Sequence, residues 1–161
     1  MKSLSFAALF LLATLALARN KPSSPHAADA PDFAAFADRY FDEYYFKFNP
    51  TQGTAAGFHQ YDNQLEDYSR ASIDKQIAVL HKFKSELASR FATNGGPIAL
   101  SIDRTLVAND IDARLLALEN IRQWEKNPDV YSGGVTNSIF VIMARTFAPP
   151  EQRLQSVIAR E

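Results

Sequence analysis

A histidine and two carboxylates lie in one short stretch of the chain, between Phe58 and Tyr68. His59, Tyr61 and Asp62 fall close together, and Asp67 follows them. An imidazole beside carboxylates can transfer a proton or hold a cation, so this stretch is a candidate wall of a substrate cleft. The alternative is that Asp62 and Asp67 accept hydrogen bonds from nearby backbone N–H groups, as turn residues do, and that Tyr61 packs on an aromatic helix.

Asn137 is the fourth candidate cleft residue, and it stands with Ser138 at the start of an apolar block. Either side chain can cap a helix or reach a substrate backbone, and capping is the favoured interpretation. His81 lies at the margin of a helical stripe, where a surface role is expected. Glu119 and Glu125 are predicted to lie on different faces of a helix. Paired-carboxylate catalysis needs two acids that face the same substrate bond, so this pair is not expected to act in that way.

Several kinds of site are excluded by composition and spacing. The 161-residue chain has no cysteine, which rules out disulfides, thiolate zinc sites and cysteine nucleophiles. Its histidines, His26, His59 and His81, are not spaced to share a metal, so no catalytic residue and no metal ligand is predicted. Seventeen Lys and Arg balance 18 Asp and Glu, which gives no electrostatic reason to expect nucleic acid as a partner.

Residues 1–18 have the pattern of a signal peptide. Lys2 precedes an apolar run, and Ala16-Leu17-Ala18 is a small-x-small cleavage site. The apolar run of residues 4–18 is shorter than the about 20 residues that a membrane-spanning helix needs. We therefore expect an exported product, periplasmic or secreted, with no membrane anchor after cleavage; a buried N-terminal helix is the alternative. Residues 19–30, rich in Pro and Ser, are expected to be a flexible leader.

A strongly aromatic helix is predicted from Pro31 to Phe48. Eight of the sixteen residues from Phe33 to Phe48 are aromatic, and they recur mostly at helical spacing. Core packing explains such a wide stripe best, and a binding platform for sugar or peptide is the alternative.

The rest of the chain is predicted to be helical as well. Asn49 is expected to cap a short turn from Pro50 to Ala56, Ser69 a helix that ends near Phe91, and Ser101 a helix that ends near Trp124. The stripe of that last helix is predicted as Leu106, Ile111, Leu115, Leu118 and either Ile121 or Arg122. Residues 131–134 are expected to form a turn, residues 135–147 a helix, and Pro149-Pro150-Glu151 the start of another. Residues 139–143 are a continuous apolar block that periodicity cannot assign, but a lone strand would have no partner, so the predicted fold class is all-α.

Several motifs, taken together and in order, resemble the N-terminal part of the bacterial family called domain of unknown function 885, over roughly residues 31–161. They are Asn49-Pro50-x-x-x-Thr54-Ala55-x-Gly57-x-His59-x-Tyr61-Asp62-x-x-Leu65-x-Asp67-x-Ser69, Trp124-Glu125-Lys126-Asn127-Pro128-x-x-Tyr131-Ser132, Gly134-Val135-Thr136-Asn137-Ser138-Ile139 and Arg145-x-Phe147-Ala148-Pro149-Pro150-Glu151-x-Arg153-Leu154. Members of that family are several hundred residues long, mostly helical, often exported and similar to zinc metallopeptidases of the gluzincin type.

The resemblance implies a fragment: an N-terminal helical domain, residues 31–161, of antiparallel helices truncated at its C-terminal end. Its partner would be the C-terminal half of the same polypeptide, and zinc and a peptide substrate would belong to the full-length parent. The family's catalytic helix lies downstream, and this chain has no His-Glu-x-x-His, so it is predicted to be inactive alone. The alternative is a small secreted helical binding or interaction protein, complete at Glu161.

Overall fold

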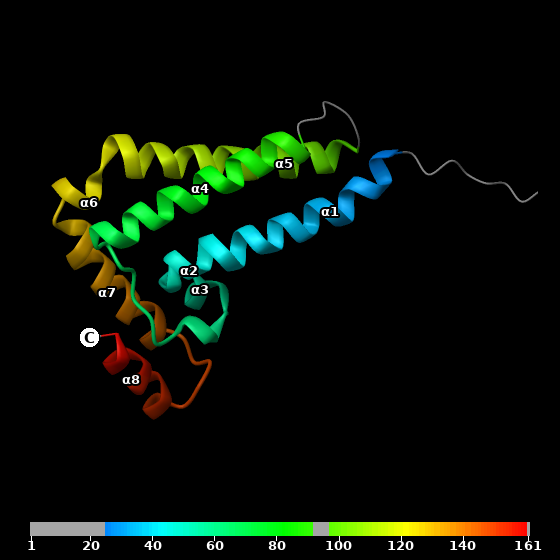
Figure 1. Cartoon of the computed structure of the whole chain (residues 1–161). Helices are drawn as coiled ribbons and strands as arrows, with labels where there is room; N and C mark the ends of the chain where they lie inside the picture. The colour runs from blue at the N-terminus through cyan, green and yellow to red at the C-terminus, as the bar shows by residue number, and fades with distance from the viewer. Residues whose placement is uncertain (1–24, 92–96, 161) are drawn as a thin grey trace, which may run out of the picture.

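The computed structural model describes residues 25–91 and 97–160, and every regular element in these ranges is helical (Figure 1). The predicted all-α fold class is therefore confirmed. The predicted signal peptide, residues 1–18, and residues 19–24 of the predicted leader lie outside the described residues. None of the described helices is both long enough and apolar enough to cross a bilayer.

The helices follow one another with short connections. The aromatic segment forms α1 (Pro25–Tyr40), a π-helical turn η1 (Phe41–Tyr45) and α2 (Phe46–Phe48), which lead to α3 (Pro50–Ala56) and the 3₁₀ turn η2 (His59–Tyr61). Then come α4 (Arg70–Arg90), α5 (Ile98–Leu115), the π-helical turn η3 (Leu116–Ile121), α6 (Gln123–Lys126), α7 (Asp129–Met143) and α8 (Pro150–Ala159).

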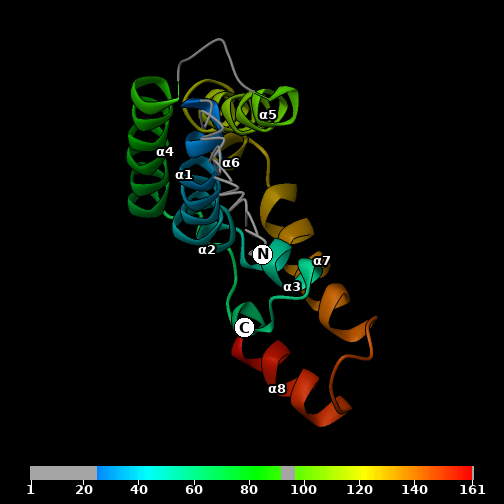
Figure 2. The same cartoon turned by 90° about the vertical axis from the view of Figure 1, so that its right-hand side faces the viewer.

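The described helices form two groups. The long helices α1, α4 and α5 lie side by side, whereas α7 and α8 extend from one end of that group, with α3 packed against α7 (Figures 1 and 2). The loop that holds η2 lies where the two groups meet, which places it beside α8.

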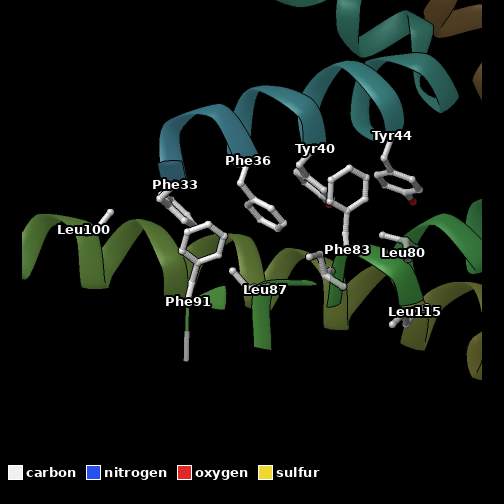
Figure 3. Packing of buried hydrophobic residues seen from close by; sticks show 11 residues of the cluster. Phe33, Phe36, Tyr40, Tyr44, Leu80, Phe83, Leu87, Phe91, Leu100 and Leu115 are labelled. Atoms are coloured by element: carbon white, nitrogen blue, oxygen red, sulfur yellow. The ribbon is translucent and has the colours of Figure 1, made fainter. Parts of the chain in front are cut away.

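The aromatic face of the first helix is the core of the long-helix group. Phe33, Phe36, Tyr40 and Tyr44 are each at most 4% exposed, and Figure 3 shows them directed at α4 and α5. Phe83 of α4 packs edge-on against both Phe36 and Tyr40. The predicted core role of these rings is therefore confirmed, and none of the four is available as a binding platform.

A polar cluster ties the aromatic helix to α5 at the end of this core. The Tyr40 hydroxyl donates to the Asp110 carboxylate, which also accepts a hydrogen bond of 2.8 Å from Nε of Arg114. The Arg114 guanidinium in turn lies over the Tyr45 ring, 4.5 Å from its centroid. Burial, then the hydrogen bond to Asp110, raises the pKa of Tyr40.

Three predicted helix starts need correction. The first helix begins at Pro25 rather than Pro31, so it includes the end of the segment expected to be a leader. α5 begins at Ile98 after Pro97, and Ser101 lies inside it, where its carbonyl accepts from the Thr105 hydroxyl. Proline suits the position ahead of a helix, because its missing N–H would have had no helical partner.

α7 also begins earlier than predicted, at Asp129. The side chain of Asn127 accepts a hydrogen bond from the Asp129 N–H at 3.0 Å and so caps the first turn. The expected turn at residues 131–134 is therefore wrong: Gly133 and Gly134 lie within the helix. The capping prediction for Asn137 and Ser138 is wrong for the same reason.

Capping is confirmed for Ser69 but is wrong for Asn49. Ser69 Oγ accepts from the Ser72 N–H at 3.2 Å at the start of α4. The Asn49 amide instead donates to the Tyr45 carbonyl, at the end of the preceding helix. Glu66 instead caps the N-terminus of α3: its two carboxylate oxygens accept hydrogen bonds from the N–H and the Oγ1 hydroxyl of Thr51, at 3.0 and 2.8 Å. A carboxylate is favoured there by the positive end of the helix dipole.

The predicted apolar stripe of α5 is only partly correct. Ile111 and Leu115 are buried, but Leu106 is 62% exposed and Ile121 is exposed as well. The buried side of α5 also includes Leu100, so the helix carries apolar residues on two opposite faces. Periodicity alone does not decide which of two apolar faces meets the core.

Candidate functional site

The loop between α3 and α4 is held against α3 by a close contact. Tyr61 packs on Gly53, where an added Cβ would come within 2.6 Å of Tyr61 Cδ2. The Tyr61 ring also lies 6.0 Å from that of Phe46, at the end of the aromatic segment. Tyr61 is thus a packing residue on the aromatic helix, as the alternative interpretation predicted, and it does not line the cavity described below.

Arg160 fixes the same loop from the other side. Its guanidinium is buried and donates to the main-chain oxygens of Asp62 at 2.8 Å and Ser138 at 2.9 Å, and to Thr54 Oγ1 at 2.8 Å. A further bond of 3.3 Å reaches the Tyr61 carbonyl. Burial lowers the pKa of Arg160, while the nearby carboxylates of Glu66 and Asp62 oppose that shift.

His59 and Asp62 form a pair at this loop. Asp62 Oδ2 lies 3.0 Å from His59 Nδ1, and the His59 ring stacks on that of Phe147, with the centroids 4.0 Å apart and the planes at 19°. Asp62 is 6% exposed, and its other oxygen, Oδ1, is buried without a hydrogen-bond partner among the described residues. The expectation that Asp62 bonds a backbone N–H is therefore wrong. Asp67 does so instead: it accepts from the Ser69 N–H at 2.8 Å, which lowers the pKa of Asp67.

The pair lines an open cavity of about 490 Å³. One side comes from the η2 loop, and the other from the α7–α8 connection and α8. Besides the pair and Phe147, the wall contains the neutral polar side chains of Gln60, Asn63, Gln152 and Ser156. Of the four predicted cleft residues, the structure thus brings His59 and Asp62 together in one cavity.

Asn137 lies elsewhere. It is an exposed residue in α7, beside a separate shallow hollow that also touches Phe140. Its neighbour Ser138 is fully buried, donates to the Val135 carbonyl, and accepts from Arg160 on its own carbonyl. Asn137 is therefore not part of the His59 cavity.

The α8 side of this cavity was not among the sequence predictions. Phe147 belongs to a motif that carries the family resemblance, but neither Phe147 nor Ser156 was predicted to line a site. The one usable signal is that Arg153 and Arg160 share the buried side of α8 with Val157. Arginine on the buried face of a helix indicates that carbonyl oxygens nearby accept hydrogen bonds from its guanidinium.

The described residues do not supply a zinc site. No group of three His, Asp or Glu side chains in residues 25–91 and 97–160 is placed to hold a metal ion. His81 is exposed on α4 and pairs with Glu119 at 2.7 Å, and so is a surface residue as predicted. Any zinc chemistry of a parent protein would need ligands from outside this part of the chain.

Comparison with protein-family models finds no match for this chain, and comparisons with curated proteins and with solved structures find none either.

Proposed function

We propose that this chain is the helical scaffold portion of an exported zinc-metallopeptidase-like protein, forms one wall of its peptide cleft, and is inactive alone. The motif resemblance supplies the class of parent protein. The observation that carries the scaffold role is that apolar faces of α5, α7 and α8 have no covering element within the described residues.

The clearest of these uncovered apolar faces lies on α5. Ile98, Ile102 and Leu106 recur every four residues and are 81%, 52% and 62% exposed. The buried residues Leu100 and Ile111 lie on the opposite side of the helix, against the core. One side of α5 thus serves the core of this chain and leaves the other available to a neighbour.

Exposed apolar side chains also occur on α7 and on α8. Phe140 is 66% exposed, and Leu154 and Ile158, one helical turn apart, are 51% and 61% exposed. Large apolar side chains that are more than half exposed, as these three are and as Ile98, Ile102 and Leu106 are, support an interaction surface. The occupant we propose is the further helical part of the same polypeptide, which the family resemblance places after residue 161.

Dye binding and self-association test the scaffold role. The purified chain without its predicted signal peptide should bind a dye for exposed apolar surface and should associate in sedimentation. Ile102→Lys combined with Leu106→Glu should reduce both signals without a loss of helix content, because neither side chain is buried. A monomer that melts in one sharp transition and binds no dye would count against the proposal.

Genomic sequence past codon 161 gives an independent test. An open frame that reaches His-Glu-x-x-His agrees with a peptidase parent, whereas a stop codon directly after Glu161 contradicts it.

The second candidate function is a small secreted binding protein. The observation in its favour is that both sides of the His59 cavity are built from residues 59–63 and 147–156 of this chain. This candidate predicts a stop codon after Glu161 and a monomer that binds a small ligand.

A further inference from the structure

We infer that the exposed face of α5 binds the same face of a second copy of this chain, with the two helices antiparallel and Asn109 at the two-fold axis. The inference uses the uncovered face on which the proposed function also rests, and it names the partner that this face takes in the chain on its own. It does not depend on a longer parent protein.

An uncharged stripe runs along the outer side of α5. Its five members are exposed and recur at alternating intervals of four and three residues, the last of them being the first residue of η3: Ile102, Leu106, Asn109, Ala113 and Leu116. This spacing keeps them in one line on a helix and is typical of a seam between two helices. Leu100 and Ile111, on the opposite side, are buried in the core, so the stripe is already held in place and a partner need not order it.

The order of residues in the stripe is symmetric about Asn109. Ile102 lies seven positions before it, and Leu116 lies seven positions after it. Leu106 lies three positions before it, and Ala113 lies four positions after it. In an antiparallel pair centred on Asn109, Ile102 therefore faces Leu116 of the second copy, and the large Leu106 faces the small Ala113, which allows close packing. A parallel pair would place Ala113 on Ala113 and leave a gap between the helices.

Asn109 gives this pair a fixed register. Its amide carries two donors and an acceptor, so two amides related by a two-fold axis can hydrogen-bond to each other. A polar residue in an apolar seam specifies the register, because a shift of one helix along the other would leave the amide against apolar side chains without a partner.

The charges beside the stripe do not oppose the pairing. Asp112 pairs with Lys84 of α4 at 2.7 Å. Asp110 pairs with Arg114 at 2.8 Å, so both acids are compensated within each copy. Asp103 lies six positions before the centre of the stripe, which places the Asp103 residues of the two copies about 18 Å apart along the antiparallel pair. They repel weakly at physiological salt, where charges are screened over about 8 Å.

The outer side of α5 is also open to a second molecule. α1 and α4 pack against its other side, and α7 and α8 extend away from it (Figures 1 and 2). A second copy can therefore reach the stripe without displacement of a described helix.

Engineered cysteines test this arrangement directly, because the chain has none of its own. We expect sedimentation equilibrium of the chain without its predicted signal peptide to show a reversible dimer. Under mild oxidation, Asn109→Cys should form a disulfide-linked dimer, since the two-fold axis brings the two thiols together. Ile102→Cys is the matched control: its two thiols lie about 21 Å apart in the antiparallel pair and should not link, whereas a parallel pair would link them.

A pair of charged variants tests the facing residues. Leu106→Glu and Ala113→Lys should each weaken association roughly tenfold or more, because a charge placed in the seam must lose its water. Both side chains are exposed, so helix content should not change. An equal mixture of the two variants should associate again, because the new carboxylate of one copy then faces the new ammonium of the other.

Three results would overturn the inference. They are an unaltered chain that stays monomeric, an Ile102→Cys variant that cross-links as readily as Asn109→Cys, and a folded Leu106→Glu variant that associates as the unaltered chain does. A monomer that binds the dye for apolar surface would overturn the dimer and leave the scaffold role in place. A stop codon directly after Glu161 would contradict the scaffold role and leave the dimer in place.

Discussion

Arg160 donates a hydrogen bond from Nη2 to Oγ1 of Thr54 at 2.8 Å, across 106 positions of the chain. The same guanidinium reaches carbonyls in α7 and in the η2 loop. One side chain at the end of α8 therefore joins α3, α7 and the loop that carries His59. The interior here is polar, since Thr54 and Ser138 are each at most 1% exposed.

Arg160→Lys should destabilise the chain by about 3 kcal/mol, because a buried ammonium cannot replace the planar fork and leaves several carbonyls unpaired. Urea unfolding measures the change. Arg145→Lys is the control: Arg145 is exposed and, within the described part of the chain, donates only to the Ala55 carbonyl, so its loss should cost less than about 1 kcal/mol. Equal effects of the two substitutions would show that Arg160 does not hold the η2 loop.

The aromatic helix could be predicted from sequence because local spacing sets its buried face. Phe33, Phe36 and Tyr40 recur at three and four residues, and all three are buried. The face of α5 could not be predicted in this way, because Leu106 and Ile111 are equally apolar and the positions of α1 and α4 decide which one is buried.

Only the part of the candidate site that is local in sequence, His59 and Asp62, was predicted. His59 and Asp62 are three residues apart, so a turn brings them together. Phe147 stacks on His59 from a connection far along the chain, and Arg160 arrives from later still. Such contacts depend on how α8 folds back, which no local pattern encodes.

Gly53→Ala should destabilise the chain by about 1–3 kcal/mol, because the new methyl group would overlap the Tyr61 ring. Gly134→Ala is the matched control in α7, where an added Cβ meets nothing within 4 Å. That change should instead stabilise by about 0.5–1 kcal/mol, since alanine favours the helix. Thermal melting should show a lower melting temperature for Gly53→Ala and a higher one for Gly134→Ala. A lower melting temperature for both variants would contradict the role given to the Gly53–Tyr61 contact.

Glu86 should contribute to stability only above mildly acidic pH. Its carboxylate accepts two bonds from Arg39, at 3.0 and 3.1 Å, and one from Arg90, which together lower the pKa of Glu86. A lowered folded-state pKa stabilises above the unfolded value of about 4.3, and this contribution is lost as the pH falls through the folded value.

Glu86→Gln should therefore cost about 1 kcal/mol at pH 7, a small figure because Arg39 is partly exposed, and the difference from the unaltered chain should vanish at strongly acidic pH. Urea unfolding over a pH series measures this. Asp74→Asn, at an exposed pair with Arg70, should have little effect at pH 7. A constant gap for Glu86→Gln at all pH values would refute the assignment.

Tyr40 should make the chain sensitive to alkali. Burial and the bond to Asp110 raise the pKa of Tyr40, so the folded chain keeps its phenol proton at a pH where the unfolded chain, with a pKa of about 10, has lost it. The unfolded state then binds fewer protons, and the free energy of unfolding falls as the pH rises above about 10.

Tyr40→Phe should cost about 1.5–3 kcal/mol at pH 7 through the lost hydrogen bond to a carboxylate. The gap in the free energy of unfolding between this variant and the unaltered chain should narrow above pH 10. Tyr44→Phe should show the same narrowing, because burial raises the pKa of Tyr44 as well. A gap that stays constant from pH 7 to strongly alkaline pH in both variants would mean that neither phenol resists ionisation in the folded chain.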